Sequence, residues 1–414
     1  MNTAPQFSST AEPGNQGEKI RILRIINRFN LGGPSYNAAY LTKYLPDKFE
    51  IMLVGGTPLP EEAHSGFIMD KLGVKYLEIN EMGRRVRLWD DWKAYRRLSK
   101  LIKTYRPHIV HTHAAKAGAL GRIAARMHGV PVIVHTFHGH VFSSYFTGMK
   151  AYLVKWIERR LASISSAIVT ISKQQFEELT SVYRICSPSR THIIPLGFDL
   201  SRFAVDNDRR RQEFRRSHGL TDTDLAIGIV GRFAPVKNHH FFIDVIKALR
   251  KRHPDLSVKA VIVGDGDART ELKNACAPYS TGTGQDGTAS DFIFTSWIKD
   301  IESFLPAMDL VVLTSLNEGT PVSLIEAQAA GVPVMSSDVG GVRDCILDGQ
   351  TGIVMPQFDA MQWADRIAAL ARDTEKRTQM GHAGQKFAPD AYGYANMVRS
   401  MEALYLQLLA KRQR

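Results

Sequence analysis

The chain has 414 residues, with 53 Lys plus Arg against 41 Asp plus Glu and 44% hydrophobic residues. At roughly 100–200 residues per domain this length predicts two or three domains, and the ordinary apolar content excludes a wholly disordered, collagenous or coiled-coil chain. The longest apolar runs are far shorter than the ~20 residues of a membrane-spanning helix. Residues 1–18 have neither a basic start nor an apolar stretch, so we expect a polar disordered tail rather than a signal peptide.

Cysteine usage and charge narrow the compartment and the partners. Cys186, Cys276 and Cys345 are widely spaced, which argues against a disulfide framework or a cysteine zinc site and favours a reducing cytoplasm. The net charge of +12 favours an anionic partner. Residues 84–106 concentrate this charge, with nine Lys/Arg and two Asp.

This basic segment has the pattern of an amphipathic helix from Asp90 onward. Apolar side chains recur there at helical spacing and leave the cations on the opposite face; they are Trp92, Tyr95, Leu98, Leu101, Ile102 and Tyr105. A solvated helix face and a face that contacts an anionic membrane both remain open. Nucleic acid is disfavoured, because no homeodomain, RRM, KH or zinc-finger pattern accompanies the charge.

Short β-branched runs alternate with amphipathic helical stretches along the whole chain. In the first half we expect strands in 19–26, 51–56, 74–79, 109–113, 130–137 and 167–172, with helices that include 36–44, the basic segment and 120–127. In the second half we expect strands in 225–233, 258–266, 292–297, 310–315 and 332–337, with helices near 241–251 and after Pro321. Continuous Val/Ile/Leu strands separated by helices are typical of parallel sheets covered on both faces.

Two such series predict an α/β protein with two doubly wound, Rossmann-like domains. We expect the domains to span 19–197 and 198–392, with a hinge in the motif PLGFDLSRF. The Gly/Ser/Thr-rich stretch 279–291 is expected to be a mobile surface loop. The final segment, 393–414, is expected to hold a helix that can pack back on the N-terminal domain.

Ligands of open parallel sheets bind beyond the carboxyl ends of the strands, so the loops there are searched first. The glycines of LGG, Leu31–Gly33, can expose N–H groups to an anion, although a ligand-free tight turn explains them equally well. Arg232 and Lys237 flank the loop after the strand LAIGIVG. A guanidinium and an ammonium at a strand end suit a diphosphate, but surface cations are also common.

The segment LTSLNEGTPVSLIEAQAAGVPV carries the most specific signal. Glu318 lies in the loop after a strand, and Glu326 lies eight residues beyond it, on a helix that starts near Pro321. Two acids at this spacing can reach different parts of one extended ligand, while the helix N-terminus attracts a phosphate. An ordinary capped helix with solvated acids is the alternative.

Seven of the fourteen histidines cluster in the first half: His108, His111, His113, His128, His135, His138 and His140. No carboxylate or thiolate nearby completes a familiar ligand set, so a metal site is disfavoured. Structural imidazoles and one or two polar contacts to a substrate remain open. Asp265-Gly266-Asp267 resembles a divalent-metal motif, but after a strand we expect it to form a turn.

Taken together, these motifs resemble the retaining sugar-nucleotide glycosyltransferases of family 4, which have the two-domain GT-B fold. The resemblance covers about 20–410 and is carried by LGGPS, RPHIVHTHAAKAGALGRIAAR, HTFHGHVF, PLGFDLSRF, GRFAPVKN, VGDG, EGTPVSLIEAQAAGVPV and DVGGVRDCILDGQTG. HTH, KAG, GR and HTFHGH are similar to the transferases of bacterial exopolysaccharide and lipid-linked oligosaccharide assembly.

The resemblance implies a role for each matching residue. Arg232 and Lys237 would bind the donor diphosphate, Glu326 the ribose hydroxyls, and Glu318 would lie beside the donor sugar. The N–H of Gly33 would approach the diphosphate, and His138 would lie near the reacting carbon. Backbone N–H groups around sugar and phosphate would come from Thr320, Pro321, Val322, Ser323 and Leu324. No metal or other cofactor is implied, because two cations and a helix N-terminus can neutralise the leaving group.

Three positions depart from the family pattern. Leu196 replaces the usual Asn of the hinge motif, Ser296 replaces the common Gly after the strand FIF, and Asp344 replaces the usual Glu after the GG turn.

The expected function is transfer, with retention, of a hexose or N-acetylhexosamine from a nucleoside-diphosphate sugar, with UDP favoured. A polyprenyl-diphosphate-linked or polysaccharide acceptor is expected, with the protein peripheral on the inner face of the cytoplasmic membrane. A GT-B-fold nucleotide-sugar 2-epimerase and a basic nucleic-acid-binding protein are the alternatives. The latter leaves Glu318 and Glu326 without a role.

Overall fold

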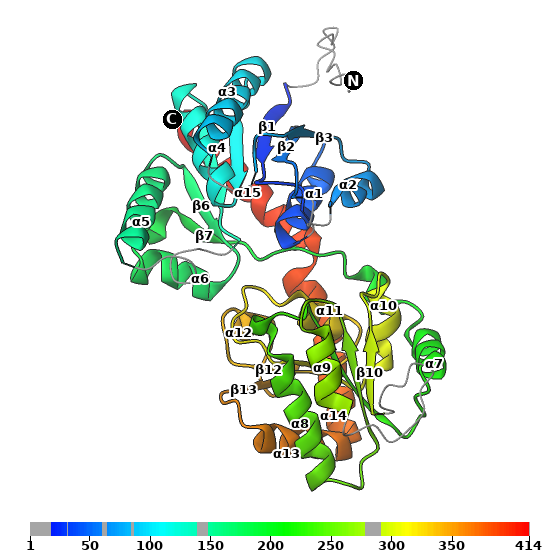
Figure 1. The fold of residues 1–414 in the computed structure, drawn as a ribbon. Helices are drawn as coiled ribbons and strands as arrows, with labels where there is room; N and C mark the ends of the chain where they lie inside the picture. The colour runs from blue at the N-terminus through cyan, green and yellow to red at the C-terminus, as the bar shows by residue number, and fades with distance from the viewer. Residues whose placement is uncertain are drawn as a thin grey trace.

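The computed structural model describes most of the chain as two α/β domains (Figure 1). The described residues are 18–30, 32–59, 64–83, 87–138, 148–277 and 291–413. The predicted disordered tail and the predicted mobile loop lie outside them, apart from Glu18 and Asp291.

Within the described residues the first domain is built on a seven-stranded parallel sheet of order β3-β2-β1-β4-β5-β6-β7. Its strands are β1 (Ile20–Ile25), β2 (Phe49–Gly56), β3 (Tyr76–Ile79), β4 (Ile109–His113), β5 (Val132–Thr136), β6 (Ala167–Thr170) and β7 (Thr191–Ile193). Its helices are α1 (Gly33–Tyr44), α2 (Gly66–Leu72), α3 (Leu88–Tyr105), α4 (Ala115–Met127), α5 (Gly148–Ser163) and α6 (Lys173–Glu177).

The second domain has a six-stranded parallel sheet of order β10-β9-β8-β11-β12-β13 in the described part of the chain. Its strands are β8 (Leu225–Val230), β9 (Val258–Val263), β10 (Phe292–Thr295), β11 (Leu310–Leu313), β12 (Val334–Ser337) and β13 (Gly352–Met355). Its helices are α7 (Asn207–Ser217), α8 (His239–Arg252), α9 (Arg269–Cys276), α10 (Ile301–Phe304), α11 (Val322–Ala329), α12 (Val342–Cys345), α13 (Ala360–Arg372) and α14 (Thr374–Tyr392).

These sheets form because their strands are apolar on both faces. Every residue of β4, β5, β6 and β11 is buried, as a parallel sheet between two helix layers requires. In the first domain, α3 and α4 cover one face of the sheet, and α1 covers the other. The predicted α/β class with two doubly wound domains is therefore confirmed.

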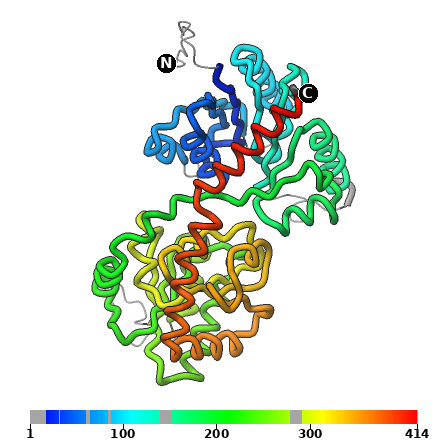
Figure 2. Tube along the Cα trace, turned by 180° about the vertical axis from the view of Figure 1, so that it is seen from behind, coloured from blue at the N-terminus to red at the C-terminus, as the bar shows by residue number. Residues whose placement is uncertain are grey.

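The chain crosses between the domains twice. The first crossing is the hinge motif, where Phe198 forms a parallel bridge with Gly393 of the second crossing. The final helix, α15 (Tyr394–Gln413), then runs back along the first domain, as Figure 2 shows in red. Its apolar side, including Met401 and Tyr405, is buried against α1, β4 and β5, so the last helix of the chain completes the first domain.

The basic helix differs from its predicted pattern at the start. Ala94, Leu98 and Ile102 are buried on α3, but Trp92, which the spacing places on the apolar face, is 49% exposed. Trp92 instead packs edge-on against the exposed Trp89, while the neighbouring Asp91 pairs with Lys116 of α4.

Candidate active site

Lys237 and Glu318 meet at the carboxyl edge of the second sheet. Lys237 ends a short 3-10 helix (Pro235–Lys237) after β8, and Glu318 follows β11, the neighbouring strand. Lys237 Nζ lies 2.5 Å from Glu318 Oε1, and the hydroxyl of Ser315 donates to the same oxygen, also at 2.5 Å. Since β8 and β11 are adjacent, the topology brings together two residues that are 81 positions apart.

Arg232 stands at the end of the same strand as Lys237, with its side chain exposed. Among the described residues no ion pair or side-chain hydrogen bond holds its guanidinium. It is therefore available to an anion, while Lys237 must exchange or share Glu318 to reach one.

A pair of glycines supports the Glu318 loop. Gly341 N–H donates to Glu318 O at 3.1 Å, and a Cβ on Gly340 would stand 1.8 Å from that same oxygen. A Cβ on Gly341 would stand 1.9 Å from Gly319 O. Sequence reasoning used these glycines for the family resemblance but gave them no role; they allow the turn to approach the loop closely.

Helix α11 begins one residue later than predicted, because Pro321 is its N-cap rather than part of the first turn. Pro321 has no N–H, and the N–H of Leu324 already donates to Pro321 O at 3.1 Å. The prediction that both offer an N–H to the ligand is therefore wrong for this conformation. Val322 and Ser323, in the first turn, and Thr320 before it remain the candidates.

Glu326 lies on α11 with its side chain 17% exposed and is held by a residue that sequence reasoning missed. Arg202, in the 3-10 helix Ser201–Ala204, donates to Glu326 Oε1 at 3.3 Å and pairs with Glu302 at 3.2 Å. Burial raises the pKa of Glu326 to about 7, the Arg202 guanidinium opposes this, and Glu302 adds to it. Tyr36 belongs to the opposite domain. Burial is the main cause that raises its pKa, while the Arg202 guanidinium lowers this pKa slightly and the Glu326 carboxylate raises it slightly.

In the first domain, Gly33 is the first residue of α1, and a Cβ there would touch Leu196 at 3.4 Å. Leu196, the residue of the hinge motif that differs from the family pattern, therefore lies against the glycine turn. Leu31 and His140 are outside the described residues.

His138 follows β5 and is joined to a buried group of imidazoles. Its Nε2 lies 2.9 Å from Nδ1 of His113. The ring of His113 packs against that of His111, with 4.2 Å between the ring centroids. Burial holds the pKa of His113 and His111 well below 6.5 and lowers that of His138 to about 4. These rings are therefore neutral at pH 7.

Asp344, the third residue that differs from the family pattern, contacts the first domain. Its Oδ2 accepts the backbone N–H of Lys173 at 2.8 Å, at the start of α6. The structure thus brings the carboxyl edges of the two sheets face to face, with Lys237, Glu318 and Glu326 on one side and His138 and Gly33 on the other.

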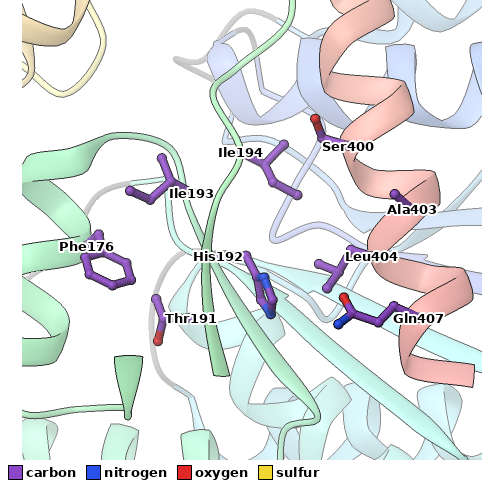
Figure 3. A pocket seen from close by; sticks show the side chains of 9 residues that line it. All are labelled: Phe176, Thr191, His192, Ile193, Ile194, Ser400, Ala403, Leu404 and Gln407. Carbon is purple, nitrogen blue, oxygen red and sulfur yellow. The ribbon is translucent and has the colours of Figure 1, made fainter. Parts of the chain in front are cut away.

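Elsewhere, a groove lies between β7 and α15 in the first domain (Figure 3). It is lined by Phe176, Thr191, His192, Ile193, Ile194, Ser400, Ala403, Leu404 and Gln407, none of which is a predicted site residue. The turn predicted at Asp265-Gly266-Asp267 lies slightly later, at Asp267 and Ala268, where the N–H of Arg269 donates to Gly266 O at 3.0 Å. Gly266 itself has a φ of 155°. Among the described residues, no three or more His, Cys, Asp or Glu side chains gather as a metal site would need.

Two known families match this chain, one for each domain. Residues 31–202 match the family described as Glycosyltransferase Family 4, and residues 210–387 match Glycosyl transferases group 1. The UDP-Gal:alpha-D-GlcNAc-diphosphoundecaprenol alpha-1,3-galactosyltransferase of Escherichia coli is 28% identical over 84% of this chain and 88% of its own. The putative glycosyltransferase EpsD of Bacillus subtilis is 28% identical over 75% and 79%.

Solved structures share the two-domain arrangement. HepE of Anabaena, crystallised with UDP, has a TM-score of 0.75 at 18% identity, covering 94% of this chain and all (100%) of that one. A glycosyltransferase of Rickettsia africae has a TM-score of 0.76 at 17% identity, covering 94% and 99%. Two doubly wound domains with facing carboxyl edges are the GT-B fold, and the family models and curated relatives indicate a glycosyltransferase. Together with the motifs, the two family models and the curated relatives support a GT-B glycosyltransferase of the family 4 type.

Proposed function

We propose that the protein transfers a hexose or N-acetylhexosamine from a nucleoside-diphosphate sugar, with retention of anomeric configuration and with UDP as the favoured nucleotide. The observation that supports this most is the meeting of Lys237, Glu318 and the start of α11 at one sheet edge. The Escherichia coli relative is named for a UDP-sugar donor, and HepE was crystallised with UDP.

Each residue has a role that its chemistry suits. Arg232 and Lys237 bind the diphosphate and neutralise the charge that develops as it leaves, together with the N–H groups of Val322 and Ser323. Glu326, once ionised, accepts hydrogen bonds from ribose hydroxyls. Glu318 lies beside the donor sugar and releases Lys237 to the phosphate.

On the facing side, the N–H of Gly33 approaches the diphosphate, and His138 lies near the reacting carbon. Thr320 and Pro321 shape the turn around the sugar, and Leu324 anchors it in the core. We further propose that transfer needs no metal ion, since cations and a helix N-terminus serve the leaving group. Full activity after treatment with EDTA is expected; activity restored only by Mg²⁺ or Mn²⁺ would reject this part.

The donor site is tested by thermal shift with a panel of nucleotide sugars, since a bound ligand raises apparent stability. Lys237→Ala and Glu326→Ala should fold, lose the shift and abolish transfer, while Lys251→Ala, an exposed lysine at the end of α8, should behave as wild type. Retained turnover in both site variants defeats the assignment. Release of an altered free sugar without acceptor would instead indicate the 2-epimerase.

For the acceptor we propose a polyprenyl-diphosphate-linked sugar, reached from the inner face of the cytoplasmic membrane. The Escherichia coli relative is named for such an acceptor. None of the described helices is long and apolar enough to span a bilayer.

The face formed by α3, α4 and α5 suits such an attachment. Helix α4 packs against both α3 and α5, and Figure 1 shows the three on the outside of the first domain. Their exposed apolar side chains are Leu88, Trp89, Trp92, Ile123, Met127, Tyr152, Leu153, Trp156 and Ile157. Arg96 lies over the ring of Trp92, and Arg160 lies over that of Trp156. Aromatic rings interleaved with cations suit an anionic bilayer surface.

Liposome flotation tests this attachment. Arg96→Glu with Arg97→Glu should reduce binding to vesicles containing phosphatidylglycerol, since each nearby cation contributes about 1 kcal/mol. Arg216→Glu with Lys251→Glu, exposed positions on α7 and α8, is the matched control. The proposal is refuted if the fraction of protein bound to vesicles depends neither on phosphatidylglycerol content nor on the substitutions Arg96→Glu and Arg97→Glu.

A further inference from the structure

The pairing of His138 with His113 leaves two buried ring nitrogens without partners. Nδ1 of His138 and Nε2 of His113 are both buried and make no hydrogen bond among the described residues. Both rings are neutral at pH 7, so each carries a single N–H. The 2.9 Å bond between them uses one of the two N–H groups, and its direction decides where the other one points.

Two arrangements are possible. If His138 donates through Nε2, the free N–H is Nε2–H of His113, a side chain that is 0% exposed. If His113 donates through Nδ1, the free N–H is Nδ1–H of His138. This atom is also buried, but the residue stands at the carboxyl edge of the sheet and is partly exposed. An orphaned buried donor is costly in both arrangements. Only the second places this donor on the residue at the sheet edge, where a bound ligand can accept it, so we favour the second.

The surroundings hold His113 in place. Arg24 donates to the hydroxyl of Tyr405 on α15 at 3.1 Å, and that hydroxyl lies 2.5 Å from Nδ1 of His111. A hydroxyl that accepts from Arg24 keeps its own proton to donate to Nδ1 of His111, and Nε2–H of His111 then faces Thr136 Oγ1 at 2.7 Å. His111 is thereby fixed, and its ring packs against His113.

We propose that His113 is a positioning residue that holds His138 in the Nδ1–H tautomer, so that His138 presents a hydrogen-bond donor to an oxygen of the donor sugar. The final helix takes part, because Tyr405 fixes the imidazole behind His113. The inference rests on the proposed function for the identity of the acceptor, but the tautomer itself is a property of the free protein.

Three variants separate positioning from stability. His113→Leu removes the donated bond, whereas His113→Asn keeps an N–H where Nδ1 stands. His135→Leu is the matched control: His135 is also 0% exposed and hydrogen-bonded, to Thr112, but on the opposite face of the sheet. It should lower the melting temperature as His113→Leu does and leave transfer unchanged.

Two readouts are expected to agree. His113→Leu should lower kcat by about 10-fold or more with little change in UDP binding, and His113→Asn should restore most of it. Long-range ¹H–¹⁵N correlation of the histidine rings, which needs no substrate, should show Nδ1–H on His138 in the wild type and in His113→Asn, and its loss in His113→Leu.

A wild-type His138 protonated on Nε2 overturns the inference whatever the protein transfers. So does equal loss of kcat in His113→Leu and His113→Asn, or a kcat for His113→Leu that matches His135→Leu. Absence of transfer with every donor, together with the expected ring spectrum, rejects the proposed function and leaves the tautomer assignment standing.

Discussion

The buried carboxylate of Glu326 carries an energetic cost that a neutral side chain would remove. Its pKa is about 7 in the folded protein, against a model-compound value of 4.5, mainly because burial disfavours the charge. At about 1.4 kcal/mol per pH unit, this difference amounts to about 3 kcal/mol.

The sign follows from which state binds the proton more tightly. Folding raises this pKa, so the group's contribution to stability is fully present below pH 4.5, declines as the pH rises, and is lost above about 7. Glu326→Gln does not ionise and should escape the loss. It should raise the free energy of unfolding by up to about 3 kcal/mol at pH 8 and by less than about 1 kcal/mol at pH 5.

Urea-induced unfolding followed by circular dichroism at both pH values measures this difference. Glu213→Gln on α7, whose carboxylate is 51% exposed, is the control and should change stability little at either pH. The same Glu326→Gln protein should bind the nucleotide sugar more weakly, since an amide is a poorer acceptor for ribose hydroxyls. A variant that is no more stable at pH 8, or equally more stable at both pH values, refutes the reasoning.

Two further predictions concern packing. Arg122→Leu should destabilise the first domain by about 3–5 kcal/mol, because it leaves the buried Glu158, now 2.8 Å from the guanidinium, without its partner; replacing both by Leu should recover most of the loss in urea unfolding. Gly340→Ala should shift the Glu318 loop and lower transfer rates strongly, because its Cβ would stand 1.8 Å from Glu318 O. Gly349→Ala, also at positive φ but facing open space, should keep wild-type kinetics; equal rates in the two glycine variants would contradict this account.

Much of the fold follows from local patterns. Continuous apolar strands alternating with amphipathic helices predicted two parallel doubly wound sheets, because a strand buried on both faces has to be apolar throughout. The exposed Trp92 shows the limit of such patterns, since spacing along a helix does not tell which residues of other elements cover each position. The spacing of Glu318 and Glu326 also predicted that both acids belong to one loop and helix, which is a local property.

The contacts that tune the candidate site are long-range, and only the tertiary structure decided them. Arg202 reaches Glu326 across 124 positions, Asp344 reaches Lys173 across 171, and Tyr405 reaches His111 across 294. Such pairs depend on strand order, on the hinge and on the path of the last helix. The sequence by itself determined the two domains and the chemistry on their loops, because local hydrophobic period and turn residues encode those. Which partner holds each charge or proton was decided only by folding, which sets the distances between distant side chains.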